Sequence, residues 1–389
     1  MNDACIVGWA HTPFGKQDAV GIETLIARVA QDAIADAGIA PGDVDEVYFG
    51  HFGAGLIREN FLSSYPMQGV PELRYKPATR VENACASGTA AIFQGLKAID
   101  AKHARIVLVV GAEKMTHLKT DDVSESLISA SYMKDEANVK GGFAGVFGQI
   151  AQQYFDRYGD QSDALARIAA KNHRNGAKNP LAQFRRDLGY EFCRTESDKN
   201  PMVAAPLKRS DCSAVSDGAA ALVLADRDIA RTLKKAIAFR AAEQVNDIKP
   251  MKSRDMTWFE GCEIGWKRAF EKSGTSLADL SCVETHDCFT VAELIEYEAM
   301  GLAPRGHGGR IVAEGWTEMD GRLPVNASGG LKAKGHPIGA TGVSMHILQS
   351  MQLTGTAADV QVKDARLAGI FNMGGAAVAN YVSILERLR

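Results

Sequence analysis

APGDVDEVYFGH at residues 40–51 and LADLSCVETH at residues 277–286 decide the fold, because each occupies the same place in a repeated pattern. An apolar helical face precedes each stretch, and a glycine, Gly38 or Gly274, ends each helix. The residues on the two faces are Leu25, Val29 and Ala33, and Cys262, Trp266 and Phe270. We therefore expect the order helix, glycine stop, acidic turn, strand and histidine to occur twice.

The correspondence continues further along the chain. CASGT at residues 85–89 and HPIGATG at residues 336–342 each open a helix, and small-residue strands are expected at 217–224 and 374–382. Strands that alternate with helices indicate an α/β fold, and the continuous apolar strand at 106–110 suits a sheet covered on both faces. We expect two βαβ-rich halves related by a pseudo-twofold axis.

A polar, largely helical stretch interrupts the first half. It is too long for a structureless loop within a compact domain, so we expect a functional lid or subdomain. The predicted division is 1–113 with 207–235 as the N-terminal half, 114–206 as the inserted domain and 236–389 as the C-terminal half.

The composition is that of an ordinary soluble protein. The 389 residues are 46% hydrophobic with a formal net charge of -3, which gives no reason to expect nucleic acid or membrane binding. The start of the chain has no secretory pattern, so a cytoplasmic location is expected. Seven widely spaced cysteines argue for free thiols rather than a disulfide framework or a zinc site.

Cys85 is the first candidate reactive residue. VENACASGTAA at residues 81–91 predicts a strand-to-helix turn, and the start of a helix favours a thiolate and can hold an oxyanion. Small neighbours would let a substrate approach. The alternative is a buried structural cysteine.

His336 is the matching candidate in the second half. It opens a helix in GHPIGATG, with Pro337 in the first helical turn, where the helix dipole disfavours an imidazolium. A neutral His336 could take the proton of Cys85. The alternative is a histidine that only caps the helix.

His286 and Cys288 form a third candidate pair. Residues two apart on an extended segment point the same way, so both could face one pocket, as acid/base and enolate-stabilising groups. A core cysteine and a hydrogen-bonded histidine are the alternative. No phosphate loop, dinucleotide fingerprint or HExxH zinc motif is present, so neither a metal nor a further cofactor is expected.

Together these residues resemble the thiolase superfamily. The likeness covers nearly the whole chain and includes the Cys85 turn, VNASGG at 325–330, GHPIGATG, and the segments FGQIA at 147–151 and AKNHR at 170–174 of the insertion. HDCF at 286–289 and Asn372-Met373-Gly374, in place of a Cys-x-Gly loop, look like the sterol-carrier-protein-linked branch and its bacterial relatives, without a sterol-carrier domain. The resemblance implies a five-layer αβαβα fold.

The resemblance also implies roles for single residues. Cys85 would be the nucleophile, His336 its base and an oxyanion donor, Cys288 the second acid/base, and His286 would place a water or donor at the enolate oxygen. Backbone N–H groups of Cys85 and Gly374 would form a second oxyanion hole. Ser328 and Gly329 would approach coenzyme A, while Lys171, Arg174 and Lys178 lie in a plausible region for its phosphates.

The expected activity is acyl transfer between coenzyme A thioesters, by reversible Claisen condensation or thiolytic cleavage of a 3-ketoacyl-CoA. Coenzyme A thioesters are substrates here. A homodimer or homotetramer is implied, and a small OB-fold partner is an open possibility. The alternatives are a decarboxylating ketoacyl synthase, which would use His286 and His336, and a thiolase-like scaffold subunit.

Overall fold

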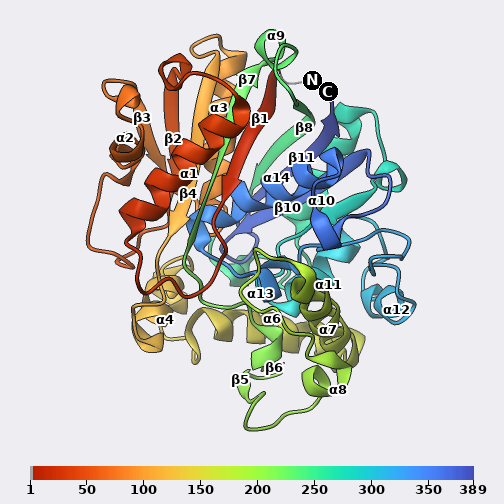
Figure 1. Ribbon diagram of the computed structural model, residues 1–389. Coiled ribbons are helices and arrows are strands. Elements are labelled where there is room, and N and C mark those ends of the chain that lie inside the picture. Colours follow the sequence, from red (N-terminus) through yellow and green to blue (C-terminus); the bar gives the residue numbers. More distant parts are fainter. Residues whose placement is uncertain (1–2) are drawn as a thin grey trace.

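The computed structural model describes residues 3–389. Nine strands form one mixed sheet in the order β3-β2-β4-β7-β1-β8-β11-β10-β9. The strands are β1 (Ala4–His11), β2 (Glu46–Gly50), β3 (Ala78–Val81), β4 (Ile106–Glu113), β7 (Gly218–Asp226), β8 (Ile237–Asn246), β9 (Cys282–Glu284), β10 (Leu367–Gly374) and β11 (Ala379–Arg387). Figure 1 shows the first half in red to orange with β7 in green, and the second half from green and teal to blue.

The two halves repeat the same pairing pattern. In the first, β2 pairs with β3 and β4 in parallel, and β4, β7 and β1 follow antiparallel. In the second, β9 pairs with β10 in parallel, and β10, β11 and β8 follow antiparallel. An isolated parallel bridge from Val283 to Val325 stands where β3 stands in the first half. The predicted repeat is confirmed, and a short antiparallel pairing of β1 with β8 joins the halves into one sheet.

Helices complete five layers. α1 (Ile22–Ala37) packs on β1, β4 and β7, and α10 (Glu260–Ser273) packs on β8 and β11. α3 (Ser87–Asp100) and α14 (Ile338–Thr354) lie between the halves, where α14 contacts strands of both. Both outer helices end at the predicted glycines, which adopt the left-handed conformation.

Alternation along the strands explains the layers. In β4, Ile106, Leu108 and Val110 face the α1 side, whereas Val107 and Val109 belong to the larger core around α3 and α14. Every residue of β4 is buried, as the continuous apolar run predicts for a sheet covered on both faces.

The two central helices approach closely because both motifs are rich in glycine. A Cβ at Gly88 would lie 2.6 Å from the Gly339 carbonyl oxygen, and one at Gly342 would lie 2.2 Å from Thr89 Oγ1. Larger residues would force the helices apart and separate the turns that start them.

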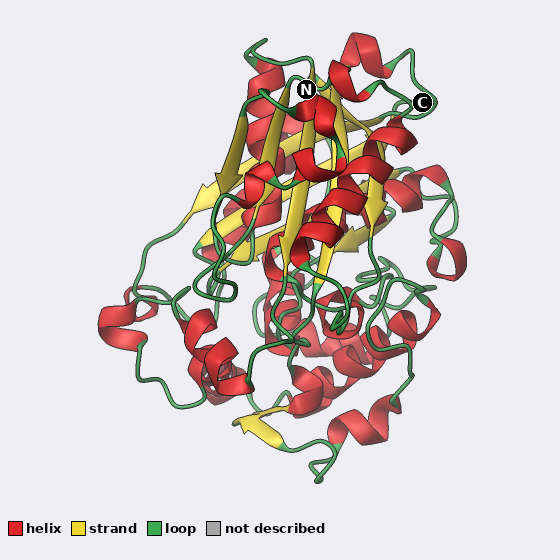
Figure 2. Ribbon diagram, turned by 60° about the vertical axis from the view of Figure 1, so that its left-hand side comes forward, coloured by secondary structure: helices red, strands yellow, loops and turns green. Residues whose placement is uncertain are grey.

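The polar stretch after β4 is largely helical. It contains α4 (Thr120–Ile128), α5 (Met133–Glu136), α6 (Gly142–Tyr158), α7 (Ser162–Lys178) and α8 (Gly189–Arg194). The hairpin of β5 (Met202–Ala204) and β6 (Leu207–Lys208) follows. Figures 1 and 2 show these elements below the large sheet, and Figure 1 places them beside α11 (Thr290–Ala299) and α13 (Gly330–Lys334). The domain boundaries themselves remain a prediction.

Two local predictions are wrong. Residues 374–382 are not one strand: β10 ends at Gly374 and β11 begins at Ala379, because the chain turns through the left-handed residues Gly375 and Ala377. β9 ends at Glu284, so His286 lies in a loop and not on an extended strand. Pro337, by contrast, is the N-cap of α14, and its carbonyl accepts the Thr341 N–H at 2.9 Å, so it takes part in the first helical turn as expected.

Within residues 3–389, no helix combines the length and the apolar character that crossing a membrane requires.

Candidate active site

Cys85 lies in a strained turn that places its sulfur near His286 and His336. The preceding Ala84 has a φ of 50°, a left-handed conformation that costs an alanine energy, and the Glu82 carboxylate accepts the Ala84 N–H at 2.5 Å. Asn83 holds the turn from the other side, because its amide nitrogen donates to the Tyr381 hydroxyl at 2.7 Å. Cys85 is 6% exposed and lies just before α3.

The Cys85 thiol stays protonated in this environment. Burial raises its pKa to about 12, although backbone N–H groups of Gly375 and of Cys85 itself hydrogen-bond the sulfur and oppose the rise. The expectation that the helix start would favour a thiolate is therefore wrong, because loss of water outweighs the helix. Cys85 needs a base at the moment it reacts.

His336 can serve as that base. Burial, followed by the charge of Lys334, lowers its pKa to about 3, so the ring is neutral. Its Nδ1 lies 2.7 Å from Thr341 Oγ1, and the Thr341 hydroxyl donates to the Pro337 carbonyl at 2.9 Å. Because the hydroxyl has a single hydrogen, it must accept from Nδ1, which leaves a lone pair on Nε2.

His286 completes a compact group with these two residues. The Cys85 sulfur and a ring nitrogen of each histidine lie within 4.8 Å of one another, and the two rings meet edge to face at 5.2 Å. Among the described residues, Nε2 of each histidine is buried without a hydrogen-bond partner. Burial, followed by His336, lowers the pKa of His286. A thiol and two imidazoles could also bind zinc, so the expectation of a metal-free site needs a chelation test.

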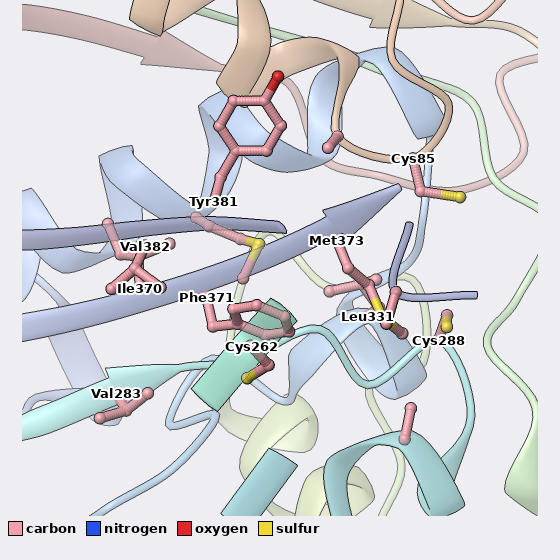
Figure 3. Packing of buried hydrophobic residues seen from close by; sticks show 14 of the residues in the cluster. Cys85, Cys262, Val283, Cys288, Leu331, Ile370, Phe371, Met373, Tyr381 and Val382 are labelled. Atoms are coloured by element: carbon pink, nitrogen blue, oxygen red, sulfur yellow. The ribbon is translucent and has the colours of Figure 1, made fainter. Parts of the chain in front are cut away.

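Cys288 approaches from the loop after β9. It lines the same cavity as Cys85 and His336, although His286 does not line that cavity. Figure 3 shows Cys85 and Cys288 at one end of a buried apolar cluster, near Met373 and Leu331. Burial, followed by the nearby Cys85, raises the pKa of Cys288 well above its ordinary value.

The cavity beside the reactive residues is apolar. Its volume is about 310 Å³, and its walls include Phe52, Met115, Phe143, Phe289 and Ile338. One side of α4 also lines it, through Val123 and Leu127.

A second, basic cavity adjoins the first. Its volume is about 760 Å³, and the two cavities share Val203 and residues 212–215. Four basic side chains line it: Arg185, Arg186, Arg209 and Lys332. Sequence analysis missed these residues, although the Arg185-Arg186 pair was a visible signal.

The residues expected near coenzyme A lie outside both cavities. Ser328 is buried and its hydroxyl donates to Glu284, while Gly329 packs against α7 so closely that a Cβ would lie 2.6 Å from Gly176 Cα. Lys171 is buried against Glu293 at 2.8 Å, and Arg174 pairs with Glu318. Neither cavity is lined by any of these residues or by Lys178.

Two further residues shape the turn after β10. Of this turn, Gly375 directs its backbone N–H at the Cys85 sulfur, and the role of its neighbour Gly374 in an oxyanion hole stays a prediction. Arg254 fixes this turn, because its guanidinium donates to the carbonyls of Ala376 at 2.8 Å and Ala377 at 3.2 Å. Neither residue has a sequence motif that would have revealed it.

Comparisons with known proteins agree with this geometry. Residues 4–228 match the family model described as thiolase, N-terminal domain, and residues 242–387 match thiolase C-terminal domain-like. The chain is 35% identical to an acetyl-CoA acetyltransferase of Methanothermobacter thermautotrophicus over the full length of both chains. It is 31% identical to human sterol carrier protein 2, covering 95% of this chain and 69% of that protein.

A solved structure shares the fold. The Ltp2-ChsH2(DUF35) aldolase superposes with a TM-score of 0.84 at 23% identity, covering 100% of this chain and 98% of that one.

Proposed function

The chain belongs to the thiolase superfamily, a group of acyltransferases, and we propose that it is an acyl-CoA thiolase that works through an acyl thioester on Cys85. One observation carries the proposal: a buried thiol and a neutral imidazole with a free Nε2 lone pair lie within 4.8 Å, beside an apolar cavity. That arrangement suits acylation of a thiol out of contact with water.

In the first half of the reaction, Cys85 Sγ attacks the thioester carbonyl carbon while His336 Nε2 takes the thiol proton. The bond from that carbon to the coenzyme A sulfur then breaks, and the departing thiolate takes the proton of Cys288. The acyl-enzyme therefore holds a cationic His336 and a Cys288 thiolate. The N–H groups near the Cys85 sulfur support an oxyanion hole for the tetrahedral intermediate.

In the second half, Cys288 takes a proton from the α-carbon of acetyl-CoA, and His286 and His336 face the enolate oxygen. The carbanion attacks the acyl carbonyl, the bond to Cys85 breaks, and Cys85 recovers its proton from His336. Thiolysis of a 3-ketoacyl-CoA is the reverse.

The two adjoining cavities support an assignment of substrate parts. The apolar cavity with Cys85 suits the acyl chain, and the basic cavity suits the phosphates of coenzyme A, which Arg185, Arg186 and Arg209 can neutralise. Cys212 and its neighbours, shared by both, would flank the pantetheine arm.

A homodimer is proposed on the free edge of β3. This strand is the last on its side of the sheet, and Phe61 and Tyr75 nearby are 81% and 92% exposed. A tetramer, a small OB-fold partner and a cytoplasmic location remain expectations. The expectation of a small partner is supported by one structural neighbour, the Ltp2-ChsH2(DUF35) aldolase, whose name includes a DUF35 component.

A decarboxylating condensing enzyme is the second candidate. The contact between His286 and His336 favours it, since two histidines serve such enzymes. The presence of Cys288 beside them favours the thiolase. Carbon–carbon bond formation with malonyl thioesters and none with acetyl-CoA would select the decarboxylating reaction.

The test is thiolysis of acetoacetyl-CoA and a longer 3-ketoacyl-CoA, followed by loss of the 3-ketoacyl absorbance. Wild-type enzyme should be active, before and after EDTA. Cys85→Ala should lose at least ~10⁴-fold in kcat, whereas Cys212→Ala, at the same cavity, should stay within about threefold. Normal turnover by Cys85→Ala would refute the mechanism, and an inactive wild type would support the scaffold alternative.

A further inference from the structure

Asn372, the residue in place of the missing family cysteine, lies at the centre of a hydrogen-bond chain. Its Oδ1 accepts the Thr89 hydroxyl at 2.6 Å, and its Nδ2 lies 2.8 Å from His286 Nδ1 and 3.5 Å from the Cys85 carbonyl oxygen. The side chain is buried between the two halves, and a Cβ on Gly342 would lie 2.7 Å from its Oδ1. The Cys85 carbonyl can only accept a hydrogen bond, so the nitrogen end of the amide is the one that faces it and His286 Nδ1.

This orientation determines the tautomer of His286. An amide nitrogen only donates hydrogen bonds, so His286 Nδ1 must be the acceptor and must lack a hydrogen. A neutral imidazole then carries its hydrogen on Nε2. Among residues 3–389, the His286 Nε2 atom is buried without a hydrogen-bond partner, and a ring nitrogen of His286 belongs to the group around Cys85.

His336 has the opposite arrangement. Its Nδ1 donates to Thr341, so its Nε2 carries a lone pair. Two rings 5.2 Å apart thus present a hydrogen-bond donor and a proton acceptor to the same space. Without this difference the site would contain two competing bases and no fixed donor.

We propose that Asn372 is a positioning residue that holds His286 as its Nε2–H tautomer, so that His286 donates a hydrogen bond to the substrate oxygen and leaves proton removal to His336 and Cys288. The proposal rests on the proposed function for its substrate. His286 keeps its own proton throughout, and the enolate oxygen gains a donor where its charge develops. Thr89 acts one step further out, by fixing which end of the amide faces His286.

The experiment first reads the tautomers without any substrate. Protein labelled with ¹⁵N-histidine is studied by NMR, with His286→Gln and His336→Gln used to assign the two rings. The proposal expects Nε2–H on His286 and Nδ1–H on His336 in the wild type. In Asn372→Asp, a carboxylate oxygen faces Nδ1, so His286 should gain Nδ1–H. A wild-type His286 with Nδ1–H would overturn the proposal, whether or not the protein is a thiolase.

The second readout separates the two half-reactions. Acylation of Cys85 is timed by quenching and mass measurement, and deuterium exchange at the acetyl-CoA methyl group is timed on pre-acylated enzyme. Asn372→Asp should slow exchange ~10²-fold or more and acylation by less than about threefold. Equal losses in both, or in neither, would overturn the proposal.

Thr89 variants provide a matched control in case Asn372→Asp folds poorly. Thr89→Ser keeps the hydroxyl and should match the wild type in both readouts, whereas Thr89→Val removes the donor to Oδ1 and should slow exchange selectively. Identical behaviour of the serine and valine variants would contradict the chain from Thr89 to His286. Absence of any acyl adduct on the wild type would reject the proposed function while leaving the tautomer result intact.

Discussion

His51 and His286 occupy equivalent places in the two halves, one after β2 and the other after β9, yet their partners differ in kind. His51 Nδ1 lies 2.9 Å from the Glu113 carboxylate and 3.1 Å from the Ala112 carbonyl, and both of these accept hydrogen bonds. His286 Nδ1 faces an amide that donates. The same repeated position therefore carries a hydrogen on Nδ1 in His51 and none there in His286, and the partner on the neighbouring strand decides which.

The partner also decides what each histidine does. Glu113 accepts backbone N–H groups of Phe52 at 2.9 Å and of Gly339 at 3.0 Å, so His51 belongs to a structural network at the start of α14. Asn372 connects His286 to the Cys85 turn instead. In the proposed mechanism, one half uses the position for packing and the other uses it for chemistry.

The largest expected effect comes from removing a base in one half and a structural ring in the other. His336→Gln should slow acylation of Cys85 ~10³-fold, because the other imidazole beside the thiol, His286, presents Nε2–H in our proposal and cannot take the proton. His51→Gln should change it less than about tenfold, since the new amide can still donate to Glu113. Rapid-quench acylation rates measure the effect of each variant. Equal losses in His336→Gln and His51→Gln would contradict the view that one histidine is a base and the other is structural.

A change of partner tests the structural network. Glu113→Gln gives His51 an amide neighbour, as His286 has, and should lower the free energy of unfolding by about 3 kcal/mol because a buried acceptor of several bonds is lost. Urea unfolding at neutral pH measures this, with the exposed Glu314→Gln, part of a surface ion pair with Arg310, as control. The same midpoint for the two variants would show that Glu113 does not stabilise the fold in this way.

Arg186 lies in the predicted inserted domain, so its replacement should weaken coenzyme A binding without slowing the chemical step. Arg186→Ala in the basic cavity should raise KM for coenzyme A about tenfold with little change in kcat, because a phosphate contact is lost. Lys178→Ala, outside that cavity, should leave KM unchanged. A raised KM for Lys178→Ala together with an unchanged KM for Arg186→Ala would contradict this assignment and favour phosphate binding near Lys178, as the sequence predicted.

The smallest expected effect is that of pH on acylation. The raised pKa of Cys85, about 12, keeps the thiol protonated at lower pH, and the lowered pKa of His336, about 3, keeps the imidazole neutral at higher pH. Neither group changes charge in between, so the rate should vary less than about threefold from about pH 5 to about pH 9. Rates that climb with pH through a thiol ionisation would show that Cys85 reacts as a preformed thiolate.

The sequence was sufficient to predict those features of the fold and site that depend on a local pattern of residues. The glycine stops, the apolar strands and the two helix-start motifs predicted the repeat, and with it the meeting of Cys85 and His336 between the halves. Sequence failed where the cause lies across the fold. The Cys85 pKa depends on burial that no local motif reports, and the turn after β10 depends on Arg254, over a hundred positions away in the chain.

Asn372 shows both sides of this limit. Sequence analysis treated it as the absence of a cysteine, although a single amide within an apolar strand is a signal in itself, because buried polar groups need partners. Its partners, Thr89 and His286, come from different halves, so only the structure could identify them.

Intact-protein and peptide mass measurements after incubation with acetyl-CoA and a longer apolar acyl-CoA test the central claim most directly. We expect one acyl group per chain, located on Cys85 and released when free coenzyme A is added. No adduct, or an adduct on Cys288 or Cys212 with Cys85 unmodified, would contradict the claim.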